Sequence, residues 1–190
     1  MKNNARVVVI GGGVVGVSTL YHLVKKGWTD CVLIERKELT SGSTWHAAGL
    51  LPLFNMSYSV GQIHKYSVDL YGRLEEETGQ YAGLSRVSNI RLATTQDRMD
   101  EYKQYAGVAQ TIGVQVDILT PDEVVDIWPL AVKDNLIGAI RHPMDGYIQP
   151  ADLTQALAKG ARDIGGQIYR NTNVTAITRT QSGECKVTTD

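Results

Sequence analysis

Three glycines near the start of the chain have the spacing of a phosphate-binding turn. Gly11, Gly13 and Gly16 form a Gly-x-Gly-x-x-Gly pattern that follows an apolar run, Arg6 to Ile10, and opens a segment of helical periodicity. In this context the first glycine allows a tight turn, the second lets a pyrophosphate approach the backbone, and the third lets the helix pack closely on the sheet. The helix start supplies amide donors and partial positive charge. The pattern therefore predicts a dinucleotide-binding turn.

An acidic residue stands where such a site needs a ribose ligand. Glu35 ends the next apolar run, Cys31 to Ile34, and lies 19 residues after Gly16. A carboxylate there accepts hydrogen bonds from ribose hydroxyls, and its negative charge repels the 2′-phosphate of NADP. Turn, helix and acid together predict dinucleotide binding, but these residues do not decide between NAD and FAD.

A loop of small and hydroxyl-bearing residues, 39–53, contains a histidine that suits a covalent cofactor. The loop has no periodicity and is long for a connector, which is typical of a binding loop. The hydroxyls of Ser43 and Thr44 can contact a pyrophosphate. His46 lies 11 residues beyond Glu35, a span of about 36 Å when the chain is extended, enough to follow a dinucleotide from adenosine to flavin. A neutral imidazole there can add to the 8α carbon of a flavin; a loop histidine that only hydrogen-bonds or stacks is the simpler alternative.

Other polar and aromatic residues give weaker signals. Arg91, His142 and Tyr147 can each bind a substrate carboxylate or shape a pocket, but no spacing brings them together, so a structural role is favoured for each. Trp28 and Trp128 are interpreted as core anchors. No catalytic residue is identified from the sequence.

The elements that must position these residues are those of an α/β fold. A strand, a helix and a strand within residues 6–34 form a right-handed βαβ unit, which predicts a parallel central sheet. Thr120, Pro121 and Glu123 have the pattern of a helix start with a capping box. Periodicity predicts helices at 63–79, 96–112 and 153–164, strands at 88–94, 114–119 and 136–141, and three short strands within 167–190.

Composition narrows the class of protein. The 190 residues are 43% hydrophobic and 21% charged, which suits a soluble chain with one sizeable core and excludes disorder, collagen and a disulfide scaffold. A net charge of -1 leaves no broad cationic surface for nucleic acid, and no apolar run approaches the roughly 18 residues of a membrane span. Cys31 and Cys185 predict neither a redox pair nor a metal cluster. The first residues lack a signal or transit pattern, so a cytoplasmic location is expected.

Several segments resemble, in the same order along the chain, the start of dimethylglycine dehydrogenases and sarcosine dehydrogenases, a branch of the glycine-oxidase-like FAD-dependent amine oxidoreductases. These segments are 11–16, 39–50, 74–79, 90–94 and Asp145-Gly146 with Pro150, and the most specific is Ser43-Thr44-Trp45-His46-Ala47-Ala48-Gly49. The resemblance implies that His46 carries FAD covalently. It implies further cofactor contacts at Gly11, Gly13, Val14, Val15, Gly16, Glu35, Arg36, Gly42, Ser43, Thr44, Trp45, Ala47, Ala48, Gly49, Leu50 and Val174.

The resemblance also implies a reaction, the oxidative demethylation of an N-methylated amino acid of the dimethylglycine or sarcosine type. Hydride passes from the N-methyl group to flavin N5, and the iminium is hydrolysed to formaldehyde or intercepted by tetrahydrofolate, which a C-terminal region would bind. An electron-transfer flavoprotein or oxygen then accepts the electrons. A non-catalytic module that binds FAD or NAD is the alternative, and a nicotinamide dehydrogenase is a third possibility.

The resemblance finally implies a domain organisation. A Rossmann-like FAD-binding domain with a parallel central sheet is expected at 1–84 and 149–190, and the start of an inserted, mainly antiparallel substrate domain at 85–148. Family members continue well beyond residue 190, so the chain is expected to be the N-terminal part of a longer protein and to be inactive alone.

Overall fold

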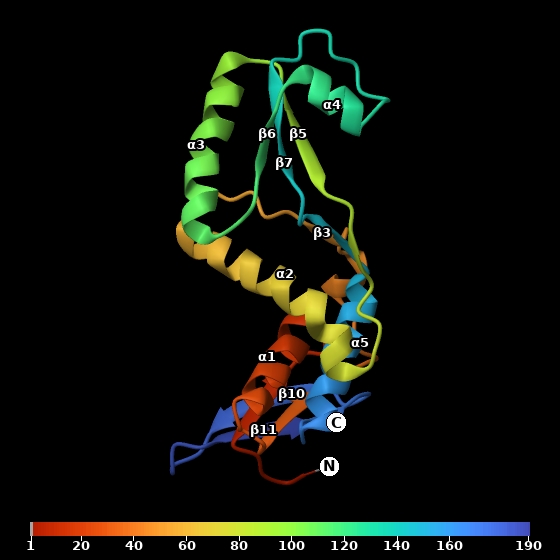
Figure 1. Cartoon of the computed structure of the whole chain (residues 1–190). Coiled ribbons are helices and arrows are strands. Elements are labelled where there is room, and N and C mark those ends of the chain that lie inside the picture. Colours follow the sequence, from red (N-terminus) through yellow and green to blue (C-terminus); the bar gives the residue numbers. More distant parts are fainter. Residues whose placement is uncertain (1) are drawn as a thin grey trace. The chain divides into compact units, whose positions relative to one another are not determined.

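The computed structural model describes residues 2–190, which form two compact units (Figure 1). Unit 1 contains the chain up to Gly49 together with Arg73–Gly83 and Gln149–Asp190, and unit 2 contains Leu50–Gly72 and Leu84–Ile148. The unit boundaries near residues 84 and 148 lie beside the expected domain boundaries. Residues 50–72 were expected to belong to the FAD-binding domain with the rest of 1–84, but their contacts group them with unit 2. The functional assignment of the domains stays a prediction.

Unit 1 is built on a parallel sheet. Its strands β1 (Val7–Ile10), β2 (Cys31–Ile34) and β9 (Gln167–Tyr169) lie side by side in the order β1-β2-β9. Helix α1 (Val14–Lys25) connects β1 to β2, and every residue of β2 is buried. The parallel βαβ unit expected from the sequence is therefore confirmed, and it places the glycine turn at the carboxyl end of β1.

Helix α1 packs against helix α5 (Pro150–Asp163) to form the helical layer of unit 1. The two helices approach closely at Gly160, where a Cβ atom would lie 2.9 Å from the ring of Tyr21. Leu20 and Leu157 are completely buried in this layer. A short 3-10 helix, η1 (Ser43–His46), and an antiparallel hairpin, β10 (Val174–Arg179) with β11 (Cys185–Thr189), complete the unit.

Unit 2 contains two antiparallel sheets of three strands. One has the order β3-β8-β4, with β3 (Leu50–Leu51), β8 (Gly146–Ile148) and β4 (Leu84–Arg86). The other has the order β5-β7-β6, with β5 (Asn89–Ala93), β7 (Gly138–His142) and β6 (Asp117–Leu119). Helix α2 (Tyr58–Thr78) begins in this unit, and α3 (Gln96–Ile112) and α4 (Pro121–Ile127) belong to it. The mainly antiparallel character expected for this region is confirmed.

The core of unit 2 lies between α3 and the β5-β7-β6 sheet. Tyr105 and Ala109 of α3 are completely buried and pack with Ile140 of β7 and Ala93 of β5. Figure 1 shows α3 running along this sheet. Helix α4 begins with the predicted capping box, in which Thr120 accepts from the Glu123 amide and Glu123 accepts from the Thr120 amide.

The interpretation of the two tryptophans as core anchors is wrong. Trp28 is 40% exposed, because it follows the left-handed Gly27 at the end of α1 and lies on the surface under the guanidinium of Arg6, 4.1 Å from the ring centre. Trp128 is 45% exposed at the C-terminal end of α4. The buried hydrophobic residues described by the structure are instead mainly aliphatic residues, alanine and tyrosine.

Replacing Gly107 by alanine is expected to stabilise the protein. Gly107 lies within α3, its backbone has no left-handed conformation, and no atom lies within 4 Å of the position that a Cβ would take. Alanine there restricts the unfolded chain without a clash, so the free energy of unfolding should rise by about 0.5–1 kcal/mol. Urea unfolding of Gly107→Ala beside the wild type measures this, and a lower midpoint would contradict it.

Candidate cofactor-binding site

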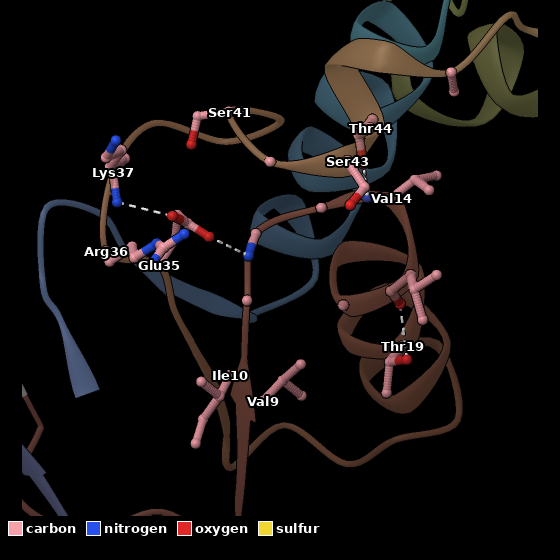
Figure 2. A pocket seen from close by; sticks show the side chains of 17 residues that line it. Val9, Ile10, Val14, Thr19, Glu35, Arg36, Lys37, Ser41, Ser43 and Thr44 are labelled. Atoms are coloured by element: carbon pink, nitrogen blue, oxygen red, sulfur yellow. Dashed lines mark hydrogen bonds between the residues drawn. The ribbon is translucent and has the colours of Figure 1, made fainter. Parts of the chain in front are cut away.

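The glycine turn lines a pocket in unit 1. The pocket has a volume of about 690 Å³ and is lined by Val9, Ile10, Gly11, Gly12, Gly13, Val14, Val15, Gly16, Thr19, Glu35, Arg36, Lys37, Ser41, Gly42, Ser43, Thr44 and Ala47 (Figure 2). Gly11 has a φ of +109°, which favours glycine. A Cβ at Gly16 would lie 2.0 Å from the carbonyl oxygen of Gly11, so only glycine lets α1 start this close to β1.

The N-terminus of α1 is open toward this pocket. Gly13 is the N-cap and provides no side-chain cap, and the first turn of the helix has no acidic residue. Val15, in the first turn, is 77% exposed. No acidic side chain in the first turn of the helix itself offsets the positive end of its dipole, and this end suits an anion such as a phosphate. A Cβ at Gly13 would stand 3.0 Å from the hydroxyl of Thr44, so glycine at this position leaves room for the Thr44 side chain beside the start of α1.

Glu35 ties the glycine turn to the end of β2. Its buried carboxylate accepts hydrogen bonds from the amide of Gly12 at 2.6 Å and from the amide of Lys37 at 2.8 Å, as Figure 2 shows. Each carboxylate oxygen has capacity for a second donor, so ribose hydroxyls remain compatible with this arrangement. The carboxylate therefore holds the turn in shape, and its contact with ribose stays a prediction.

The loop that follows β2 returns to the start of α1. Thr44 in η1 is buried, and its hydroxyl accepts a hydrogen bond from the amide of Val14 at 2.9 Å (Figure 2). The amide of Trp45 donates to the carbonyl of Thr40, which has a left-handed φ of 72°. These contacts place Ser43 and Thr44 beside the start of α1, and the contact of their hydroxyls with a pyrophosphate stays a prediction.

His46 closes η1, and its ring orientation is set by a backbone carbonyl. The imidazole is exposed, and its Nδ1 lies 3.2 Å from the carbonyl oxygen of Gly42. Because a carbonyl can only accept, Nδ1 is the donor, and of the two neutral tautomers this contact selects the one with the lone pair on Nε2. The structure thus leaves Nε2 of His46 free of this contact.

The pocket brings together most of the residues expected to bind the cofactor. Those that line it are Gly11, Gly13, Val14, Val15, Gly16, Glu35, Arg36, Gly42, Ser43, Thr44 and Ala47. Trp45, His46, Ala48, Gly49 and Val174 belong to unit 1 but do not line it, and Leu50 belongs to unit 2. For these residues, cofactor contact stays a prediction.

Several lining residues were missed by the sequence analysis. They are Val9, Ile10, Gly12, Thr19, Lys37 and Ser41. Most are chain neighbours of expected residues, so adjacency alone would have found them. Thr19 lies one helical turn after Val15, and its hydroxyl donates a hydrogen bond to the carbonyl of Val15 at 2.8 Å. The helical spacing of Thr19 from the expected residue Val15 was therefore the signal that could have identified it.

Two of the three polar candidates of unit 2 lie in or near its core. His142 is completely buried, and neither ring nitrogen has a hydrogen-bond partner among residues 2–190. Burial lowers the pKa of His142 to about 4, so the ring is neutral at neutral pH, and it packs against the rings of both Phe54 and Tyr105. The guanidinium of Arg91 lies 4.5 Å above the ring of Phe54. Tyr147 is half-exposed in β8. The burial of His142 supports its structural interpretation.

Asp145 is a buried carboxylate whose titration predicts a pH-dependent stability. It is 1% exposed, and burial raises its pKa from 3.8 to about 6. The folded protein therefore binds this proton more tightly than the unfolded chain, and the stabilisation present below pH 4 is lost as the pH rises through 6.

An Asp145→Asn variant should therefore gain stability over the wild type by about 2 kcal/mol between pH 4 and pH 7. The titration of His142 has the opposite sign but occurs in both proteins, so it cancels in the difference. Urea unfolding of both proteins at the two pH values measures the change, and a difference independent of pH would contradict it.

Other classes of site are not found in the described part of the chain. Within residues 2–190 no group of three or more His, Cys, Asp or Glu side chains could hold a metal ion. Cys31 is buried, Cys185 is exposed, and both are free thiols. No helix in this range has the length and apolar character needed to cross a bilayer.

Comparison with known proteins agrees with this geometry. The chain is 43% identical to dimethylglycine dehydrogenase of Rattus norvegicus over 99% of its own length and 22% of that protein. It is 39% identical to sarcosine dehydrogenase of Homo sapiens over 93% of its length and 40% identical to a pyruvate dehydrogenase phosphatase regulatory subunit of Mus musculus over 90%. The chain spans 19% of each of these last two proteins.

A solved structure shares the fold across the whole chain. The L-proline dehydrogenase of P. horikoshii matches 100% of this chain and 50% of its own, with a TM-score of 0.89 and 27% identity. Residues 6–190 match the DAO family, described as FAD dependent oxidoreductases. An open helix N-terminus, a glycine cradle and a carboxylate at the end of β2 are what the adenosine diphosphate part of FAD requires. The chain belongs to the family of FAD-dependent oxidoreductases.

Proposed function

We propose that the full-length protein is a flavin-dependent oxidoreductase that removes a methyl group from N-methylated amino acids of the dimethylglycine or sarcosine type. The observation that carries the proposal is the turn Ser43–His46, whose first two residues line the pocket and whose last residue is an exposed histidine. The similarity to a dimethylglycine dehydrogenase and a sarcosine dehydrogenase supports the class of substrate.

The residues of this chain bind and orient the cofactor. The amides at the start of α1 and the hydroxyls of Ser43 and Thr44 are proposed to bind the pyrophosphate, and Glu35 the ribose. FAD, when bound, supplies the acceptor for the hydride that leaves the N-methyl group. The uncharged amine and the hydride path require little acid–base machinery from this part of the protein, and no residue here is assigned as catalytic.

His46 is proposed as the covalent attachment point of FAD. Donation from Nδ1 to the carbonyl of Gly42 orients the ring and leaves the Nε2 lone pair for the new bond. In the balanced reaction the imidazole and the 8α-methyl group each lose one hydrogen, a C–N bond forms, and oxygen takes up both hydrogens as hydrogen peroxide. A fixed tautomer favours this reaction because the nucleophilic nitrogen needs no prior proton transfer.

The reaction is tested by the product of demethylation. The full-length protein incubated with dimethylglycine or sarcosine and an electron acceptor should release formaldehyde in proportion to amine consumed. Glycine, which has no N-methyl group, should give none. Oxygen and an electron-transfer flavoprotein are the two proposed acceptors, and added tetrahydrofolate should lower free formaldehyde if a C-terminal folate site is present. Consumption of amine without formaldehyde would contradict the proposal.

A non-catalytic FAD-binding module is the second candidate. One observation favours it, because a relative at 40% identity is named as a regulatory subunit. Such a module would keep FAD through the glycine turn but would not transfer electrons from the amine. Membership of an FAD-dependent family leaves the nicotinamide dehydrogenase without support. The cytoplasmic location expected from the sequence stays a prediction, which fractionation of the source cells tests.

A further inference from the structure

The short helix η1, which carries His46, is attached to unit 1 by a buried side chain. Of residues 41–48, all of which the structure describes, Thr44 alone is buried. Its hydroxyl accepts from the amide of Val14 at 2.9 Å, although the two residues are 30 positions apart. Because α1 begins at Val14, this amide has no acceptor within the helix. Gly13 has no side chain to cap α1, so a residue of η1 provides the cap instead.

The Thr44 hydroxyl fits closely against the glycine turn. A Cβ at Gly13 would lie 3.0 Å from Oγ1 of Thr44, so the hydroxyl lies next to the space that glycine leaves empty. Earlier in the same loop, the amide of Thr40 donates to the carbonyl of Gly12 at 3.0 Å. The loop therefore contacts the glycine turn at two points, and the Thr44 hydroxyl is the one nearer to His46 in the chain.

The backbone of η1 connects Thr44 directly to His46. The amide of Ala47 donates to the carbonyl of Thr44 at 3.2 Å, which closes the turn that contains His46. The carbonyl of Gly42 accepts from the amide of Trp45 at 3.3 Å and lies 3.2 Å from Nδ1 of the His46 ring. All of these residues lie in one continuous segment of unit 1. A displacement of Thr44 therefore displaces both the imidazole and the carbonyl that orients it.

We propose that Thr44 is a positioning residue for the covalent attachment of FAD, because its hydroxyl fixes η1 on the start of α1 and so holds His46 in place. The inference rests on the proposed tether at His46 and adds a residue that does not itself react. A hydroxyl that accepts from Val14 can still donate its own proton, so the proposed contact of Thr44 with the pyrophosphate is compatible with this role. Loss of the hydroxyl should slow attachment, since a misplacement of about 1 Å reduces rates by up to roughly a hundredfold.

The first test compares rates of attachment in the full-length protein, prepared without flavin and mixed with saturating FAD in aerated buffer, where oxygen is the oxidant. Acid-precipitable flavin is followed over time. Thr44→Ala should attach FAD at least about tenfold more slowly than the wild type. Thr44→Ser, which differs from Thr44→Ala only in the hydroxyl, should attach FAD within about threefold of the wild-type rate.

Thr78→Ala is the matched control. Thr78 is another buried threonine of unit 1, its hydroxyl accepts from the amide of Gln80 at 3.3 Å, and it does not line the pocket. This variant should attach FAD at the wild-type rate. The non-covalent affinity of every variant is measured in a His46→Ala background, so that FAD is saturating in each rate measurement. Thr44→Val, which keeps the volume of the side chain without the hydroxyl, decides the question if Thr44→Ala does not fold.

The second test needs no FAD and measures how firmly η1 is held. Amide hydrogen exchange of the flavin-free, full-length protein is followed by mass spectrometry of peptides that cover residues 41–48. These peptides should exchange at least about fivefold faster in Thr44→Ala than in the wild type, because loss of one hydrogen bond favours opening of the turn by about this factor. Thr44→Ser and Thr78→Ala should exchange as the wild type does. This measurement separates a loosened η1 from a lost contact with the pyrophosphate.

A wild-type attachment rate in Thr44→Ala would overturn the inference, as would equal slowing in Thr44→Ser or in Thr78→Ala. Slow attachment in Thr44→Ala with unchanged hydrogen exchange of residues 41–48 would show that Thr44 acts only on FAD, and would also overturn it. A wild type that attaches no FAD would instead overturn the proposed tether at His46, so the two failures give different results.

Discussion

In the full-length protein, His46→Ala is expected to lose all flavin on denaturation, whereas the wild type keeps it. The reason is chemical, because alanine has no nitrogen to form the C–N bond, while the residues that line the pocket are unchanged. The folded variant should therefore still bind FAD, but reversibly. Mass spectrometry of the denatured chains measures the result as a mass increase equal to bound FAD in the wild type alone.

A second histidine provides the control for this experiment. His64 lies in the part of α2 that belongs to unit 2, and His64→Gln should retain FAD after denaturation as the wild type does. Flavin released freely from the denatured wild type would show that the tether is wrong. Flavin retained by His46→Ala would show that another residue carries it.

The second large effect is expected at Gly16. A Cβ there would lie 2.0 Å from the carbonyl oxygen of Gly11, which is backbone and cannot rotate away, so α1 must shift from the end of β1. Such overpacking costs about 1–3 kcal/mol, and the shift moves the amides that are proposed to bind the pyrophosphate. We expect Gly16→Ala to bind FAD at least about tenfold more weakly.

The affinity is measured by FAD fluorescence quenching in a His46→Ala background, where binding is reversible. Gly107→Ala is the matched control, because the same change at an uncrowded glycine of α3 should leave the affinity unaltered. Equal affinities of Gly16→Ala and the control would contradict the close approach of helix and strand at this turn.

Local patterns predicted the elements of the cofactor pocket well. The glycine spacing, the buried β2 and the capping box at Thr120 each depend on residues within a few positions of one another. Helix α3 has the predicted bounds, 96–112. The strand expected at 114–119 begins only at Asp117, because the amide of Val114 is used by the carbonyl of Ala109 at the end of α3. Here the helix cap competes with the strand for the same backbone group.

Contacts between distant parts of the chain could not be predicted. Periodicity does not show that Trp28 lies under Arg6 or that His142 is completely buried against Phe54. It also does not show that Leu53 and Asp145, far apart in sequence, share a buried hydrogen bond. These features depend on how strands from separate segments pair, which local residue types specify only weakly.

The central claim, that the protein uses FAD to oxidise N-methylated amino acids, is tested most directly by the absorption spectrum of the full-length protein under anaerobic conditions. Addition of dimethylglycine or sarcosine should bleach the flavin band, and addition of glycine should leave it unchanged. A flavin band that dithionite bleaches but neither N-methylated amino acid does would contradict the claim and would favour a non-catalytic FAD-binding module.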